Sequence, residues 1–170
     1  WVGLKRWVGN RHDIQLENSF ISYLMLGYYL EWLIYLDKHV KEMNRLHRRL
    51  LSKLCTTEIE IALKVQSIIW LAVVHPLRCA VQAKDARITD FNELAVRLQE
   101  LAAIFESDPL KLLDAEFVAF PTKCDLEMVA RYRKRYGPAI ALVFSVPKKD
   151  TEKNLLVMML KACGLAITEQ

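Results

Sequence analysis

The chain has 170 residues, of which 53% are apolar and 26% are charged. A chain this apolar can bury enough surface to offset its conformational entropy, which excludes intrinsic disorder. Its 5 Gly and 5 Pro are too few for a turn-rich β sandwich or a linker, and its net charge of +4 is too small to indicate a polyanionic partner by itself.

The first predicted element is one long helix over residues 18–54. Apolar side chains recur in it at alternating spacings of three and four residues, the heptad pattern of a helix that packs against other helices. Its first half is apolar nearly all round and should be covered by other helices, whereas its second half should show one face to water. The heptad stripe consists of Leu26, Tyr29, Leu33, Leu36, Val40, Met43, His47, Leu50 and Leu54.

The segment from Phe20 to Leu36 also bears on the question of a membrane, because it holds a single charged residue, Glu31. A helix that spans a membrane needs about 20 apolar residues, and a charge near its centre is costly. We therefore interpret the segment as a buried core helix and do not expect a membrane as the partner.

The second predicted helix covers residues 58–75. Thr57 and Glu60 form a capping box before it, in which each side chain satisfies the free backbone amide of the other residue. Pro76 should end or kink this helix, and residues 77–83 should continue helically. Its expected core stripe is Ile61, Val65, Ile68 and Ala72.

A third helix is predicted over residues 91–106, with Asp90 and Glu93 as its start signal. After it, Asp108-Pro109 should open a short helix that ends near Glu116, because proline is favoured at the first helical position. The expected core stripe of helix 91–106 is Phe91, Leu94, Leu98, Leu101 and Phe105.

The C-terminal part should hold a helix over residues 122–136, closed by Gly137-Pro138. Residues 139–146 are apolar or small, which fits a buried strand or a short buried helix, and we favour the helix because no second strand is evident. A last helix over residues 151–163 should end at Gly164.

Together these elements predict an all-α protein, a multi-helix bundle of six or seven helices built around helix 18–54. The length fits a single domain over residues 1–170, with a looser C-terminal subdomain at 122–170 as an alternative. Because the first residue is Trp1 and not Met, we expect a piece of a longer protein.

The sequence shows no catalytic or metal-binding motif. Its four cysteines, Cys55, Cys79, Cys124 and Cys163, have no paired spacing, so we expect reduced thiols in an intracellular protein. The adjacent pair His12-Asp13 is best explained as a solvated helix start. We expect a protein that is not an enzyme, with no cofactor, no metal and no small-molecule substrate.

Two clusters of basic residues are the features that could bind a polyanion. Guanidinium and ammonium groups on a helix face suit contacts with phosphate. Both clusters also fall near predicted helix C-termini, where cations complement the helix dipole and stay solvated, and we favour this second explanation. The clusters are Arg45, Arg48, Arg49 and Lys53, and Arg131, Arg133, Lys134 and Arg135.

The heptad stripe provides a second candidate surface. If the stripe is wider than the other helices of the chain can cover, the surplus predicts a homo-oligomer or the helix of a partner protein. The expected partner-helix face is Leu36, Val40, Met43, His47 and Leu50.

Two segments resemble hAT-superfamily transposases and the host proteins derived from them. Leu4-Lys5-Arg6-Trp7 is similar to the Arg-Trp pair before the helical insertion of that family, and residues 77–89 resemble a leucine-rich helix, Gln, turn and new helix within the insertion. The resemblance covers residues 4–105. The Thr usual before Arg-Trp is absent, and so is a counterpart of the family's dimerisation segment.

The resemblance implies a DNA-associated, non-catalytic helical module in the nucleus, because the family's catalytic carboxylates lie outside the insertion. From the residues themselves we favour a non-catalytic helical interaction module that mediates protein–protein association or oligomerisation. A module that contacts nucleic acid through its basic helix ends is the alternative.

Overall fold

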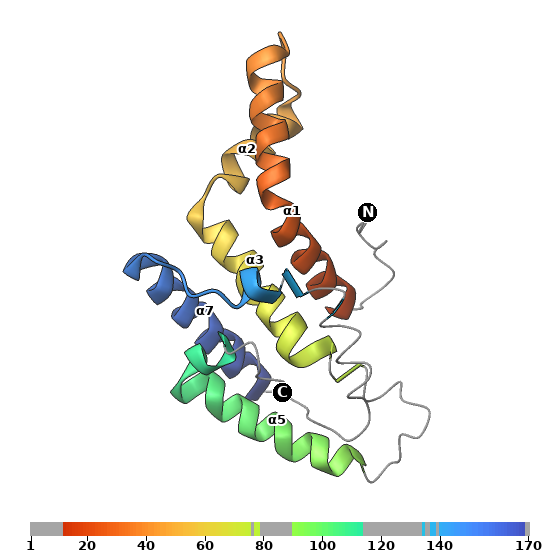
Figure 1. Ribbon diagram of the computed structural model, residues 1–170, viewed down its shortest axis with the longest axis vertical. Helices are drawn as coiled ribbons and strands as arrows, with labels where there is room; N and C mark the ends of the chain where they lie inside the picture. Colours follow the sequence, from red (N-terminus) through yellow and green to blue (C-terminus); the bar gives the residue numbers. More distant parts are fainter. Residues whose placement is uncertain are drawn as a thin grey trace. The chain divides into compact units, whose positions relative to one another are not determined.

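A computed structural model describes residues 12–75, 77–78, 90–113, 134, 137–138 and 140–168. These residues form helices and connecting turns without a strand, which confirms the all-α class (Figure 1). The chain divides into two compact units, Trp1–Ser67 and Ile68–Gln170. The sequence predicts one domain, with a looser subdomain from residue 122 as an alternative, whereas this division falls inside the predicted helix 58–75.

The first unit contains α1 (His12–His39), α2 (Arg45–Leu54) and the first part of α3 (Thr57–Ile69). The prediction of one helix over residues 18–54 is wrong, because the helix ends at His39 and a second begins at Arg45. The side chain of Asn44 caps α2 by accepting a hydrogen bond of 2.8 Å from the amide of Leu46. The chain folds back here, so α2 runs along α1 as the second arm of a helical hairpin (Figure 1).

Side chains of α1 and α3 hold the rest of the first unit together. Ser19 hydrogen-bonds to the side chain of Gln66, and the buried ammonium of Lys64 lies 5.9 Å from the ring centroid of Tyr23. Around these polar contacts the core consists of Phe20, Ile21, Leu26, Leu33, Ile61 and Val65.

The second unit begins at Ile68, at the end of α3, and α3 is followed directly by a π-helix over Trp70–Val74. The amide of His75 donates a hydrogen bond to the carbonyl of Trp70. The predicted helix 58–75 is thus present with a π-helical last turn. Residues 61, 65, 68 and 72 of its stripe are all buried, as predicted.

The second unit also contains α5 (Asp90–Ser107), a 3₁₀ helix (Pro109–Leu113) and α7 (Asp150–Thr168). Helices α5 and α7 pack against each other and against the 3₁₀ helix (Figure 1). Their shared core includes Leu101, Phe105, Leu112, Leu156 and Leu160. The predictions of helix 91–106 and of a short helix after Asp108 are therefore confirmed.

One expected helix end is wrong, because Gly164 does not end the last helix, which continues to Thr168. Gly137 and Pro138, expected after the end of a helix, are themselves helical. In the ambiguous segment 139–146, residues 140–143 are helical, as we favoured, and Val143 and Phe144 are buried. The predicted helices 77–83 and 122–136 lie outside the described residues, except for residues 77–78 and Lys134, which are helical.

Candidate functional site

The chain reversal between α1 and α2 rearranges the predicted partner-helix face. Met43 is buried in the turn, while Leu36 and His47 are half-buried. Val40 is 44% exposed and Leu50 is 40% exposed. The five residues therefore do not form one continuous face, because the second half of the stripe folds back onto the first.

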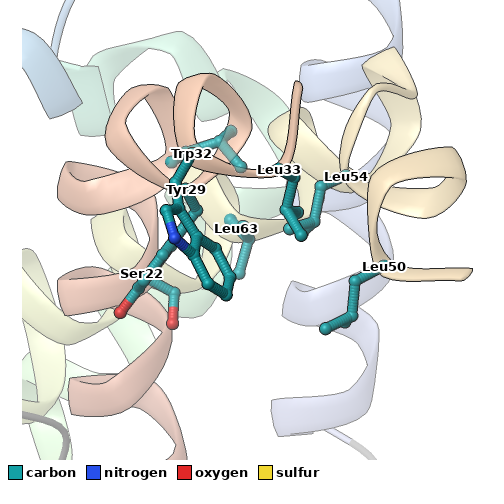
Figure 2. A pocket seen from close by; sticks show the side chains of 8 residues that line it. Ser22, Tyr29, Trp32, Leu33, Leu50, Leu54 and Leu63 are labelled. Carbon is teal, nitrogen blue, oxygen red and sulfur yellow. The ribbon is translucent and has the colours of Figure 1, made fainter. Parts of the chain in front are cut away.

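An apolar cavity of about 380 Å³ opens between the two arms of the hairpin. Figure 2 shows Ser22, Tyr29 and Trp32 of α1 on one side and Leu50 of α2 on the other, with Leu63 of α3 between them. No charged side chain lines the cavity, and Ser22, Tyr29 and Trp32 supply its only polar groups. The full lining is Ser22, Leu26, Tyr29, Trp32, Leu33, Leu50, Leu54 and Leu63.

Several large apolar side chains of α1 and α2 are exposed, which differs from the expected burial of the first half of the predicted long helix. Residues 14–26 of α1 contribute most of its buried side chains, whereas its C-terminal half presents large rings and aliphatic groups to solvent. The most exposed of these on α1 are Tyr28 at 68%, Tyr35 at 59%, Trp32 at 50% and Ile34 at 40%, and Leu46 at the start of α2 is 60% exposed.

Two histidine rings contact these exposed aromatic residues. His47 of α2 meets Trp32 of α1 edge to face, with ring centroids 5.2 Å apart, and this contact joins the two arms at the rim of the cavity. His39 lies against Tyr35, one helical turn earlier, at 4.4 Å. The contact with the Trp32 ring therefore explains why a histidine occupies this position of the apolar heptad stripe.

The first basic cluster lies on α2, the helix that also carries the exposed Leu46 and Leu50. Arg45, Arg48, Arg49 and Lys53 are exposed, and α2 contains no acidic residue. Arg48 donates a hydrogen bond of 3.4 Å to the backbone carbonyl of Met43. In the part of the chain that the structure describes, none of the four forms an ion pair.

Only one residue of the second basic cluster is among the described residues. Lys134 is exposed on a helical segment, and Arg131, Arg133 and Arg135 lie outside the described residues. The segments that carry the transposase resemblance, residues 4–7 and most of 77–89, lie outside them as well.

The remaining chemical groups do not gather into a site within the described ranges. No cluster of three or more metal-binding side chains is found there. Helix α1 begins at His12, as expected of a helix-start pair. Cys55 is exposed and Cys163 is half-buried, both as free thiols, and burial raises the pKa of the Cys163 thiol. Cys79 and Cys124 lie outside the described residues.

None of the described helices is long and apolar enough to cross a membrane. No protein-family model, no curated protein and no solved structure matches this chain.

Sequence reasoning missed Ser22, Trp32 and Leu63 as parts of the candidate site. Ser22 continues the heptad spacing four residues before Leu26 but is polar, Trp32 lies off the stripe, and Leu63 belongs to α3. They come together because the chain reverses after His39. One signal in the sequence marks this reversal. Asn44 is a preferred N-cap residue, and it falls inside the predicted long helix, where asparagine is unfavourable.

Proposed function

We propose that this chain is a helical interaction module that associates with another protein through the α1–α2 hairpin and acts by binding, not by catalysis. The observation that carries the proposal is the open apolar cavity, whose lining includes the exposed Trp32 and Leu50, together with the exposed Leu46 one turn before Leu50 on α2. Exposed apolar surface at an open cavity is typical of protein interaction sites. Removing it from water would stabilise a complex by the hydrophobic effect.

A synthetic peptide replaces the unknown partner in the test of this proposal. It is a charge-balanced helical peptide of about 20 residues with leucines at helical spacing, long enough to fold in part on its own. We expect the peptide to change the fluorescence of Trp32, measured in a variant that lacks the other tryptophans. Light scattering of the chain alone, over a range of concentrations, tests for self-association as the other form of the same function.

Two substitutions probe the surface. Leu50→Glu places a charge at the cavity, and Leu46→Glu places one beside it on a side chain that is already 60% exposed. Both should weaken peptide binding or self-association at least tenfold. Met158→Glu, on an exposed position of α7, is the matched control and should change neither. A strictly monomeric chain that binds no leucine-rich peptide would contradict the proposal.

A second candidate function is contact with nucleic acid, as in a transposase-like nuclear protein. The observation that favours it is the group of exposed arginine and lysine side chains on α2 that form no ion pair within the described residues. Four phosphate contacts would lower the affinity for duplex DNA by roughly a hundredfold between about 50 and 200 mM salt. Fluorescence anisotropy of labelled DNA measures this, and no binding at the lower salt concentration would eliminate the candidate.

A further inference from the structure

Two rows of side chains run next to each other along α2. Residues four apart lie on one side of a helix, one turn above each other. The apolar row is Leu46, Leu50 and Leu54, and the basic row is Arg45, Arg49 and Lys53. Because Leu50 and Leu54 line the cavity and Leu46 is exposed, the apolar row leads from the cavity to the open surface. The basic row borders it along its whole length.

The shape of this surface suits a helix. The cavity is open between two helices, and its apolar lining continues onto a row with the four-residue spacing of a helix ridge. Ridges of this spacing fit into the grooves of a second helix, and an amphipathic helix binds an apolar groove through side chains three and four residues apart. One large apolar side chain of such a helix would enter the cavity as its anchor.

The charges on α2 indicate which charged residues the partner helix should carry beside its apolar stripe. Arg45, Arg49 and Lys53 form no ion pair in the described part of the chain, and α2 has no carboxylate of its own. A partner with lysine or arginine beside its apolar stripe would bring like charges together, which disfavours binding. Carboxylates at the same positions would instead meet three exposed cations.

The same charges argue against a second copy of this surface as the occupant. A symmetric dimer uses the same patch on both chains. If two copies met through α2, the basic row of each copy would find no carboxylate on the α2 of the other, because this helix contains no acidic residue. In an antiparallel pairing the two basic rows would also lie side by side, with Arg45 and Arg49 desolvated next to like charges.

We infer that the occupant is an acidic amphipathic helix of another protein, with an apolar anchor in the cavity and carboxylates along the basic row of α2. This inference rests on the proposed function, and it adds the chemistry of the partner.

The experiment compares three synthetic helical peptides that share one leucine stripe and differ in the residues beside it, which are glutamate, lysine or an equal mixture. At about 50 mM salt we expect the glutamate peptide to bind at least tenfold more tightly than the lysine peptide. Raising the salt to about 500 mM should shrink this difference, since screening weakens exposed charge pairs.

A double substitution, Arg45→Glu and Arg49→Glu, should reverse the preference. The control Lys111→Glu and Lys161→Glu makes the same change in net charge at exposed positions of the second unit and should leave the preference unchanged. Circular dichroism of both variants checks that the helices are intact.

The outcomes separate the two proposals. Equal binding of all three peptides would overturn the inference and leave the interaction module standing, whereas no binding of any peptide, together with a monomeric chain, would overturn both. Preference for duplex DNA over the glutamate peptide, abolished by the α2 double substitution, would also overturn the inference.

Discussion

Gly164 shows how a single residue depends on its tertiary neighbour. It lies buried in the interior of α7, where that helix meets α5. A Cβ atom placed on Gly164 would lie 2.5 Å from the Cβ of the fully buried Phe105, which is closer than two such atoms approach in proteins. The missing side chain is therefore what permits this close contact between the two helices.

We expect Gly164→Ala to lower the free energy of unfolding by about 1–3 kcal/mol, because the extra methyl group forces α5 and α7 apart. Urea denaturation followed by circular dichroism measures the change. Gly27→Ala is the matched control, since nothing lies within 4 Å of its added Cβ, and it should stabilise α1 by about 0.5–1 kcal/mol. Equal effects of the two substitutions would show that the contact with Phe105 is unimportant.

Ionisation of the Tyr23 hydroxyl should make the first unit less stable at high pH. Burial raises the pKa of Tyr23 to about 12 from its ordinary value of 10.0, and the negative charge of Glu60 acts in the same direction. The pKa of Tyr23 is higher in the folded state than in the unfolded state. The neutral Tyr23 hydroxyl therefore makes its full contribution to the free energy of unfolding below pH 10. It is lost as the pH rises from 10 to about 12.

We therefore expect the wild-type chain to lose stability over this interval more steeply than Tyr23→Phe, which has no ionisable hydroxyl at this position. The free energy of unfolding of both proteins, measured at intervals from pH 8 to pH 12, tests this. Parallel profiles would mean that ionisation of Tyr23 is not coupled to folding.

At the scale of elements, the α1–α2 hairpin is the main difference between sequence pattern and structure. The spacing of three and four residues continues from Leu26 to Leu54 through the turn, because both arms need apolar residues on the side that faces the other arm. A heptad pattern reports which residues face a partner helix. It does not report whether that partner is a separate helix or the continuation of the same chain.

The cap of α2 should contribute to the stability of the hairpin. We expect Asn44→Ala to cost about 1 kcal/mol of unfolding free energy, because the amide of Leu46 loses its hydrogen-bond acceptor. Asn44→Asp should retain most of the stability, since aspartate caps helices as well as asparagine does.

Asn154→Ala, at an exposed position within α7, is the control for this prediction and should be neutral or slightly stabilising. Denaturant unfolding of the three variants under one set of conditions makes the comparison. A loss for Asn154→Ala as large as that for Asn44→Ala would contradict the capping role.

At the scale of the whole molecule, each compact unit has an apolar core of its own. Leu33 belongs to the core of the first unit, and Leu160 belongs to that of the second. Both side chains are almost completely buried, so Leu33→Ala and Leu160→Ala should each cost about 2–5 kcal/mol.

Because the two leucines belong to different cores, we expect the costs of these substitutions to add within about 0.5 kcal/mol in the double variant. Calorimetry of the wild type, both single variants and the double variant measures the four unfolding free energies of this double-mutant cycle. A coupling larger than this would mean that the chain has a single cooperative core.

The sequence by itself determined the all-α class, the bounds of α5 to within a residue or two, and the buried stripe of α3. These features depend on local periodicity and on start signals such as Asp90 and Pro109, which a chain carries regardless of its neighbours. For residues 139–146 the sequence only favours a helix over a strand, because eight apolar or small residues in a row have no period that separates the two. Residues 140–143 are helical in the structure.

Only the tertiary structure decided that residues 18–54 form two arms and that Gly164 continues a helix instead of ending it. It also assembled the cavity from α1, α2 and α3. The physical reason is common to all three. Each depends on which side chain lies opposite, Trp32 against His47 or Gly164 against Phe105, and such contacts join residues that are far apart in the sequence.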